Sequence, residues 1–75
     1  MTRQLELQEL QLALSENIRT LRGKRGLSQE RLALEAGVDR TLVSKIERAV
    51  ANPTLGVLTK LALVLEAPAT RLLKS

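Results

Sequence analysis

The stretch AGVDRTLVSKIE, residues 36–47, decides the fold expected of this chain. Gly37 can take the left-handed conformation that ends one helix, and Asp39, two residues later, can cap the next helix. Val43 and Ile46 then lie on one face of that next helix, where they form an apolar stripe. Because polar residues occupy its other side, we expect this helix to have one buried face and one free face.

Turn residues divide the rest of the chain into further short helices. The first expected helix begins as early as residue 5, ends at Gly26 and carries one apolar stripe: Leu7, Leu10, Leu14, Ile18 and Leu21. Leu5 and Leu12 lie off this stripe. The N-terminal end is therefore expected either to pack on the last helix or to contact another chain.

Two hydroxyl residues are predicted to cap the remaining longer helices. Ser28 begins a helix that runs to Ala36, and Thr54 begins the fourth helix. The fourth helix is expected to bury an apolar set: Leu55, Leu58, Leu61, Ala62 and Leu65. A fifth helix, from about Pro68, is too short to be stable alone and must dock through Leu72 and Leu73. The sequence thus predicts an all-α fold of five helices.

Composition limits the possible functions. Seventy-five residues make one small domain, whose core must be aliphatic because the chain contains no Phe, Trp or Tyr. It also contains no Cys or His, which removes disulfides, thiolate chemistry and the usual zinc ligands. The carboxylates are scattered beside basic residues rather than paired, which disfavours a carboxylate-based hydrolase. We expect no enzymatic activity, no metal and no cofactor.

The charge of the chain favours a polyanionic partner. Its net charge is +4. Residues 1–15 sum to −1, whereas residues 16–48 sum to +3, from eight basic and five acidic residues. No signal peptide or membrane-spanning stretch is visible, so the expected location is the cytoplasm, without a membrane partner.

The free face of the helix that begins after Asp39 carries Arg40, Thr41, Ser44 and Lys45. One interpretation is a solvated face on an ordinary helical hairpin. The other is a DNA-reading face, because the major groove admits one α-helix and its base edges match long donors and short adaptable groups. Free amides at Ser28, Gln29 and Glu30 could hold a phosphate.

The stretch LSQERLALEAGVDRTLVSKIERAVANPTLGVLTKLALVL, residues 27–65, resembles the helix-turn-helix domain of phage Cro and cI-type repressors, the XRE family of bacterial regulators. The motifs that match are LSQ at residues 27–29, AGV at 36–38, VS and IE in residues 43–47, NPT at 52–54, and LA at 61–62 with Leu65. SENIRTLRGKRG, residues 15–26, matches the first helix of the family. The resemblance covers about residues 11–73 and leaves residues 1–10 as a helical extension of a single domain, residues 1–75.

The resemblance implies a compact, five-helix, lambda-repressor-like domain that binds DNA as a dimer. It implies roles for several groups of residues, carried over by position. Base contacts are expected from Arg40, Thr41, Ser44, Lys45 and Gln29. Phosphate contacts are expected from Ser28, Gln29, Asp39, Arg25, Arg48, Asn52 and Thr54. Arg22 and Glu47 are expected to form a structural ion pair. Apart from the resemblance, Leu72 and Leu73 are expected at a dimer interface, with one of the two leucines turned into the core of the single chain and the other shared with the second copy.

The chain departs from the family pattern in three places. Ala49 stands where a glycine commonly ends the recognition helix, which predicts either a strained left-handed cap or a longer helix. The loop AVANPT, residues 49–54, contains no basic residue, so phosphate contacts there would depend on amides and short polar side chains. Glu66, Ala67 and Pro68 replace the usual glycine-containing turn, which leaves the dimer geometry open.

The sequence therefore predicts a dimeric regulator of transcription that binds a (pseudo)palindromic operator, with the controller of a restriction-modification system as the favoured subtype. The expected partners are double-stranded DNA, a second copy of the chain and RNA polymerase, with no small-molecule effector. The alternative is a protein-interaction or antitoxin-type module that keeps the fold and works through its leucine-rich N-terminal helix.

Overall fold

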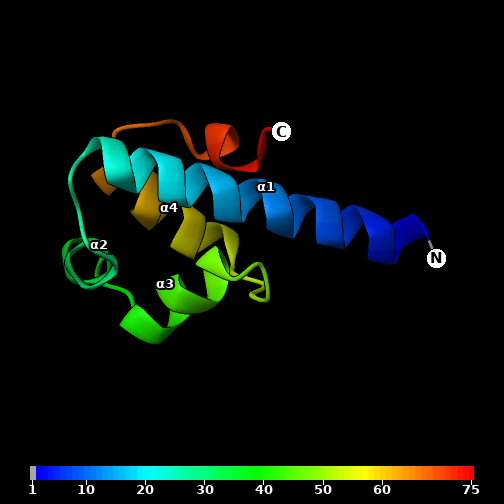
Figure 1. Ribbon diagram of the computed structural model, residues 1–75, viewed down its shortest axis with the longest axis horizontal. Helices are drawn as coiled ribbons and strands as arrows, with labels where there is room; N and C mark the ends of the chain where they lie inside the picture. The colour runs from blue at the N-terminus through cyan, green and yellow to red at the C-terminus, as the bar shows by residue number, and fades with distance from the viewer. Residues whose placement is uncertain (1) are drawn as a thin grey trace.

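The computed structural model describes the backbone of residues 2–75 and the side chains from residue 5 onward. Four α-helices and a short 3-10 helix follow one another (Figure 1): α1 (Thr2–Lys24), α2 (Gln29–Ala36), α3 (Arg40–Glu47), α4 (Leu55–Leu65) and η1 (Ala69–Leu73). The predicted all-α fold is confirmed. The fifth helix is a 3-10 helix, as suits a five-residue segment whose N-cap, Pro68, makes no side-chain cap bond.

Side-chain caps fix the starts of α2, α3 and α4 where the sequence predicts them. The Ser28 hydroxyl accepts from the Arg31 amide at 2.9 Å, and the Asp39 carboxylate accepts from the Thr41 amide at 2.9 Å. The Thr54 hydroxyl accepts from the Val57 amide at 3.1 Å. Each cap contributes about 1 kcal/mol to stability because it satisfies a helix amide that would otherwise lack an acceptor.

Left-handed residues end the helices. Gly26 (φ 66°) and Gly37 (φ 70°) take this conformation as predicted. Ala49 (φ 61°) and Glu66 (φ 58°) take it as well, at a cost of roughly 1–2 kcal/mol for a residue with a Cβ atom. At Ala49 the next amide, that of Val50, donates to the Lys45 carbonyl at 3.1 Å. Of the two alternatives predicted for residue 49, the strained cap is therefore the one observed.

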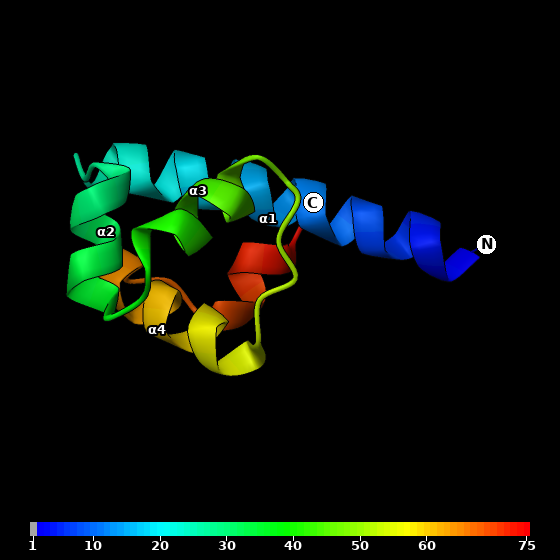
Figure 2. The same ribbon diagram turned by 90° about the horizontal axis from the view of Figure 1, so that it is seen from below.

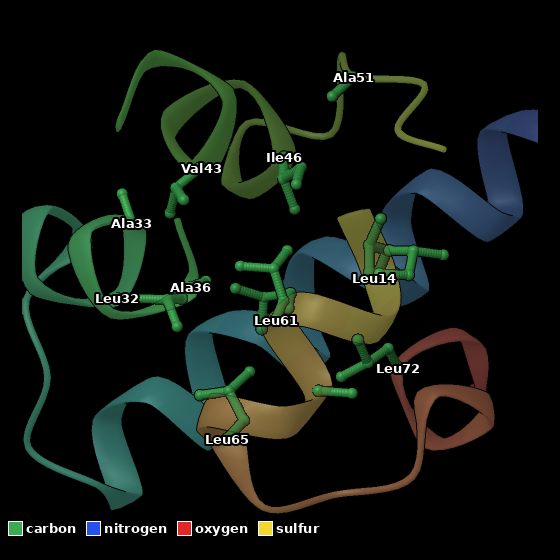
Figure 3. Close-up of a cluster of buried hydrophobic side chains, with 13 residues drawn as sticks. Leu14, Leu32, Ala33, Ala36, Val43, Ile46, Ala51, Leu61, Leu65 and Leu72 are labelled. Carbon is green, nitrogen blue, oxygen red and sulfur yellow. The ribbon is translucent and has the colours of Figure 1, made fainter. Parts of the chain in front are cut away.

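The core is aliphatic and is shared by every helix (Figure 3). α1 packs on α3 and η1, α2 packs on α3 and α4, and α4 packs on η1. The largest fully buried side chains are Ile18, Leu32, Val43, Ile46, Leu61 and Leu72. Burial of each such side chain stabilises the fold by about 1.5–3 kcal/mol, so these residues hold α3 against the other helices.

Two expectations about the helices require correction, the burial of Leu55 and the start of the first helix. Leu55 was expected to face inward, but it is 76% exposed, because it lies at the rim of an open apolar hollow that it shares with Leu7 and Leu10 of α1. Leu7 and Leu10, for which the sequence left the partner open, continue the stripe of Leu14 and Ile18 and are 39% and 40% exposed. α1 begins at Thr2 rather than residue 5, and its N-terminal end extends past the other helices (Figures 1 and 2). Of the predicted extension, residues 1–10, residue 1 lies outside the described residues.

Polar side chains of α1 fasten distant parts of the chain. The Gln11 amide donates to the Ala51 carbonyl at 2.9 Å, and the Ser15 hydroxyl donates to the Glu47 carbonyl at 2.7 Å. The Asn17 amide donates to the carbonyls of Leu72 (2.9 Å) and Lys74 (2.7 Å). These bonds fix the ends of α3 and η1 against α1. Within residues 2–75, no helix has the length and apolarity that crossing a membrane requires.

Candidate nucleic-acid interface

Helix α3 has two chemically different faces. Its inner residues, Val43 and Ile46, are 0% and 1% exposed. On the outer side Arg40, Thr41 and Lys45 are exposed, and Ser44 is half-buried. Arg40, Thr41 and Ser44 line a shallow, open depression. Figure 1 shows α3 at the edge of the molecule farthest from η1. Four of the five residues predicted for base contact therefore lie together on a helix whose orientation the core fixes; the fifth, Gln29, lies in α2.

Helix α2 places its N-terminus beside the last residue of α3, since Gln29 bonds to Glu47. α2 packs directly on α3, and the two are joined through Gly37, Val38 and Asp39. The Ser28 hydroxyl is bound to the Arg31 amide, whereas the amides of Gln29 and Glu30 precede the first intrahelical bond, from the Leu32 amide to the Ser28 carbonyl. Amides at this position, with the positive end of the helix dipole, form a site suited to an anion.

A buried ion pair joins α1 to the end of α3. Arg22 Nε and Nη2 donate to the two carboxylate oxygens of Glu47 at 2.7 and 2.9 Å. The side chains of Arg22 and Glu47 are 21% and 4% exposed. Arg22 Nη1 also donates to the Leu27 carbonyl at 2.7 Å. The two residues that the sequence analysis paired are thus in contact through two parallel bonds, the geometry that gives such pairs directional specificity.

The pKa values of this pair follow from its contacts. Burial alone would raise the pKa of Glu47, but the hydrogen bonds from Arg22 and Gln29, together with the positive charge of Arg22, lower it below its ordinary value. The hydrogen bond to Glu47 raises the pKa of Arg22 further. Both groups are therefore charged at neutral pH, and the carboxylate has a structural role.

Gln29 is a predicted contact residue whose side chain is held by a hydrogen bond to another helix. It is half-buried, and its Nε2 atom donates to Glu47 Oε1 at 2.9 Å. This bond links the first residue of α2 to the last residue of α3. Because one N–H of the amide is occupied, its second N–H and its carbonyl oxygen are the groups left for a ligand.

The residues predicted to contact phosphate fall into two groups. Arg48 and Asn52 are exposed near the end of α3, and Arg25 is exposed at the end of α1, where its Nη1 atom lies 2.6 Å from the Glu66 carboxylate. Asp39 and Thr54 are exposed, but their side-chain oxygens cap helices. For Asp39 and Thr54, the groups left for a ligand are the remaining lone pairs of the side-chain oxygens, the Thr54 hydroxyl proton and the backbone amides.

Leu72 is the leucine that turns inward, so its assignment to a dimer interface requires correction. Leu72 is 0% exposed and belongs to the core of the single chain, so it cannot contact a second subunit. The reason is that η1 turns this side chain inward while Asn17 binds the backbone of η1. Leu73 is half-buried and lines an apolar hollow beside α1.

Sequence reasoning missed the polar residues of α1 that position the site. Ser15 is 2% exposed, and its hydroxyl donates to the backbone carbonyl of Glu47, the residue that pairs with Arg22. Gln11 holds the loop after α3 through Ala51. The available signal was weak: Ser15 adjoins Leu14 of the buried stripe, and a polar residue beside such a stripe is usually hydrogen-bonded when it is buried.

Comparison with known proteins identifies the family to which this arrangement of α2 and α3 belongs. The helix-turn-helix family model matches residues 18–72. The chain belongs to this family. The predicted resemblance to XRE-type helix-turn-helix proteins is therefore confirmed, and α2 and α3 are the helix-turn-helix motif of this domain.

Three relatives illustrate the helix-turn-helix proteins to which the chain is similar. It is 42% identical over 66 residues to a hypothetical transcription factor of Neisseria meningitidis serogroup B, which covers 88% of this chain and 62% of the relative. It is 42% identical over 60 residues to the control protein C.SmaI of Serratia marcescens, covering 80% of this chain and 71% of the relative. The crystal structure of the restriction-modification controller protein C.AhdI from Aeromonas hydrophila superimposes with a TM-score of 0.79 at 37% identity, covering 83% of this chain and 94% of that one.

Proposed function

We propose that this chain is a sequence-specific double-stranded DNA-binding regulator of transcription that acts as a dimer on a (pseudo)palindromic operator. The observation that carries the proposal is the two-sided character of α3. Val43 and Ile46 fix the helix from within, while Arg40, Thr41 and Lys45 are exposed on its outer side. The major groove of B-DNA admits one such helix and presents hydrogen-bonding edges that long donors can read.

The proposed base contacts follow from the chemistry of each side chain. Arg40 can donate two bonds to guanine N7 and O6, and Lys45 can reach a guanine acceptor or a phosphate. Thr41 can contact a thymine methyl group, and Ser44 provides a small adaptable donor and acceptor within the groove. Gln29, oriented by its bond to Glu47, can add a contact at the groove edge with its free N–H and carbonyl oxygen.

The proposed phosphate contacts surround this face. The amides of Ser28, Gln29 and Glu30, at the N-cap and first turn of α2, can bind one phosphate. Exposed side chains of Arg25, Arg48 and Asn52 can bind others. Asp39 and Thr54, whose side-chain oxygens cap helices, would contribute backbone amides. Such contacts position the protein on the duplex but read no sequence.

We propose a dimer because one domain of this size buries little surface against DNA. Two copies related by a twofold axis can place their α3 helices about 34 Å apart, in successive major grooves. We propose that residues 1–75 form one domain, with a family core at about 11–73 and a helical extension at 1–10. The proposed regulator is non-catalytic and cytoplasmic, with RNA polymerase as a further partner. The similarity to C.SmaI and C.AhdI supports a role in controlling a restriction-modification system.

One observation favours an alternative, a protein-interaction or antitoxin-type module. The N-terminal part of α1 exposes four leucines: Leu5, Leu7, Leu10 and Leu12. In this alternative they would be the working surface, and α3 would be a solvated helix.

Binding to duplexes selected from a random oligonucleotide pool, measured over a range of salt concentrations, separates the two functions. A DNA-binding protein that neutralises Z phosphates loses affinity with a log–log slope of about −0.9Z. We expect the purified chain to select a twofold-symmetric site with a steep slope. Failure to select any sequence, together with salt-independent capture of a protein partner, would favour the alternative.

A further inference from the structure

The carboxylate of Glu47 determines which end of the Gln29 amide faces it. Gln29 Nε2 donates to Glu47 Oε1 at 2.9 Å. Glu47 is charged at neutral pH, and an ionised carboxylate accepts hydrogen bonds but donates none. If the amide turned over, its oxygen would lose this bond and would face a negative charge. Only the nitrogen end of the Gln29 amide therefore fits against Glu47.

The other end of the amide, Gln29 Oε1, is open to solvent. The one side-chain hydrogen bond that Gln29 makes within residues 5–75 uses its nitrogen. Gln29 is half-buried, and in the same part of the chain no buried side-chain nitrogen or oxygen lacks a hydrogen-bond partner. Because Oε1 has no such partner, it must be accessible. It is thus a free acceptor at the first residue of α2.

Arg22 holds the Glu47 carboxylate in the position that orients Gln29. Its Nε and Nη2 atoms donate to the two carboxylate oxygens at 2.7 and 2.9 Å. Its Nη1 atom donates to the carbonyl of Leu27, two residues before Gln29, at 2.7 Å. The guanidinium also neutralises the carboxylate, so the pair places no net charge beside Gln29. The orientation of the amide is therefore fixed from α1 and α3 before any ligand binds.

An accessible acceptor distinguishes the groups that a DNA duplex offers. The phosphates and sugars of DNA present acceptors only. In the major groove the donors are the exocyclic amino groups of adenine (N6) and cytosine (N4), whereas guanine O6 and thymine O4 are acceptors. An acceptor that loses its water on binding and meets no donor costs affinity. Gln29, held in this orientation, favours a base that carries an amino group.

We propose that Glu47 is a positioning residue for sequence reading, because it holds the Gln29 amide so that Oε1 accepts from the amino group of an adenine or cytosine at one base pair of each half-site. The inference rests on the proposed function and deepens it. It gives the buried acid of the ion pair, which contacts no DNA itself, a part in base preference as well as in stability.

The rival contact for Gln29 is a phosphate. The second N–H of its amide can donate to a phosphate oxygen beside the N-terminal amides of α2. Such a contact would strengthen binding to every sequence equally, because phosphates carry no base information. It would also leave Oε1 without a donor, which is why the base contact is favoured.

The orientation of the amide is tested first in the wild type and without DNA, so it depends neither on a variant that folds nor on a known operator. Nitrogen-15 relaxation measures the mobility of each side-chain amide. Gln8, an exposed glutamine of α1, is the matched control. We expect an order parameter for Gln29 near that of rigid backbone, about 0.85, and one for Gln8 below about 0.6. Equal mobility of the two amides would overturn the inference.

Base preference is then measured by binding to the selected operator with each base pair replaced in turn. Gln29→Met removes the amide but keeps the ion pair of Arg22 and Glu47. Glu47→Gln lets the Gln29 amide turn over, so that it can also donate to guanine O6 or thymine O4. A preference is the ratio of the affinities of one protein for two duplexes. The fraction of folded chain therefore cancels, even for a destabilised variant.

We expect the wild type to prefer an amino-bearing base at one base pair by about fivefold or more, and each of the two variants to reduce this preference to less than about twofold. The double variant should reduce it no further, because Glu47 acts there only through Gln29. The control variants Gln8→Met and Glu16→Gln, which change exposed residues of α1, should keep the wild-type preference.

Three results would overturn the inference. One is an unchanged preference in Glu47→Gln, and another is a loss of preference in this variant that is spread over several base pairs, as displacement of α3 would cause. The third is a Gln29→Met protein that binds every sequence equally more weakly, which would assign Gln29 to a phosphate. In each case the chain still selects an operator, so the proposed function stands. Selection of no sequence by the wild type would refute the proposed function, and this inference with it.

Discussion

The carboxylate of Glu47 connects three helices, and its replacement by glutamine is the most informative test of the fold. It accepts hydrogen bonds from Arg22 Nε (2.7 Å), Arg22 Nη2 (2.9 Å) and Gln29 Nε2 (2.9 Å). Glu47→Gln keeps the size of the side chain but removes its charge and places an amide N–H₂ group against these donors. Arg22 then loses its counterion while its side chain is still 21% exposed.

The expected loss is large for a domain of this size. Breaking a buried ion pair by neutralising one partner typically costs about 3–5 kcal/mol. Arg22 is partly solvated and keeps its bond to the Leu27 carbonyl, so we expect a smaller loss of about 2–3 kcal/mol. At about 0.05–0.15 kcal/mol per residue, the whole domain has roughly 4–11 kcal/mol of stability. The melting temperature should therefore fall by roughly 8–24 °C.

Urea and thermal unfolding at pH 7, followed by circular dichroism, measure this loss. Glu16→Gln is the matched control, because Glu16 is an exposed acid on α1, and its replacement should change the free energy of unfolding by less than about 0.5 kcal/mol. If Glu47→Gln changes the free energy as little as this control does, the structural role of the pair is refuted.

The same variant has a defined pH dependence. The folded chain lowers the pKa of Glu47 below its ordinary value of 4.5, so the unfolded chain binds the proton first on acidification. The contribution of the Glu47 carboxylate to the free energy of unfolding is fully present above the ordinary pKa. It is lost as the pH falls through the lower pKa of the folded chain. The stability difference between wild type and Glu47→Gln should therefore shrink on acidification below about pH 4.5. A difference that stays constant from neutral pH to about pH 3 would contradict this assignment.

Changes at three further positions test other parts of the fold. Ala49→Gly should raise the free energy of unfolding by roughly 0.5–1 kcal/mol in urea titrations, because it relieves the left-handed strain at φ 61°; a loss of stability would contradict that reading. Asn17→Ala should lower the free energy of unfolding by about 1–3 kcal/mol and accelerate hydrogen exchange of the η1 amides. The reason is that it removes the bonds to the Leu72 and Lys74 carbonyls. Unchanged exchange would argue against this role of Asn17. Thr54→Ala should cost about 1 kcal/mol and Thr54→Ser only a few tenths, because serine keeps the cap; equal losses would indicate that the hydroxyl cap is unimportant.

The features that could be predicted from the sequence depend on local chemistry. Ser28, Asp39 and Thr54 cap helices through residues two or three positions away, so the sequence itself contains both partners of each bond. The spacing of the apolar residues also identified the inner face of α3. It failed at Leu55, because a helical pattern does not reveal whether a neighbouring element is present to cover its first turn.

The features that could not be predicted depend on contacts between distant residues. Asn17 binds carbonyls 55 and 57 positions away, and Gln29 binds Glu47, 18 positions away. Such pairs form only after the helices have packed, and neither residue has a local signature. For the candidate interface, the sequence therefore identified the outer residues of α3 but not the bond that orients Gln29.

The central claim is that the outer side of α3 reads a DNA groove while its inner side is held by the core. Equilibrium binding to the selected operator, compared between Arg40→Ala and Lys60→Ala, tests it most directly. Lys60 is an exposed residue of α4, so its variant loses the same charge outside α3. Arg40→Ala should weaken binding roughly 5- to 150-fold, or about 1–3 kcal/mol, and relax the preference at one base pair, whereas Lys60→Ala should keep that preference. If Arg40→Ala binds with unchanged affinity and unchanged base preference, α3 does not read the groove.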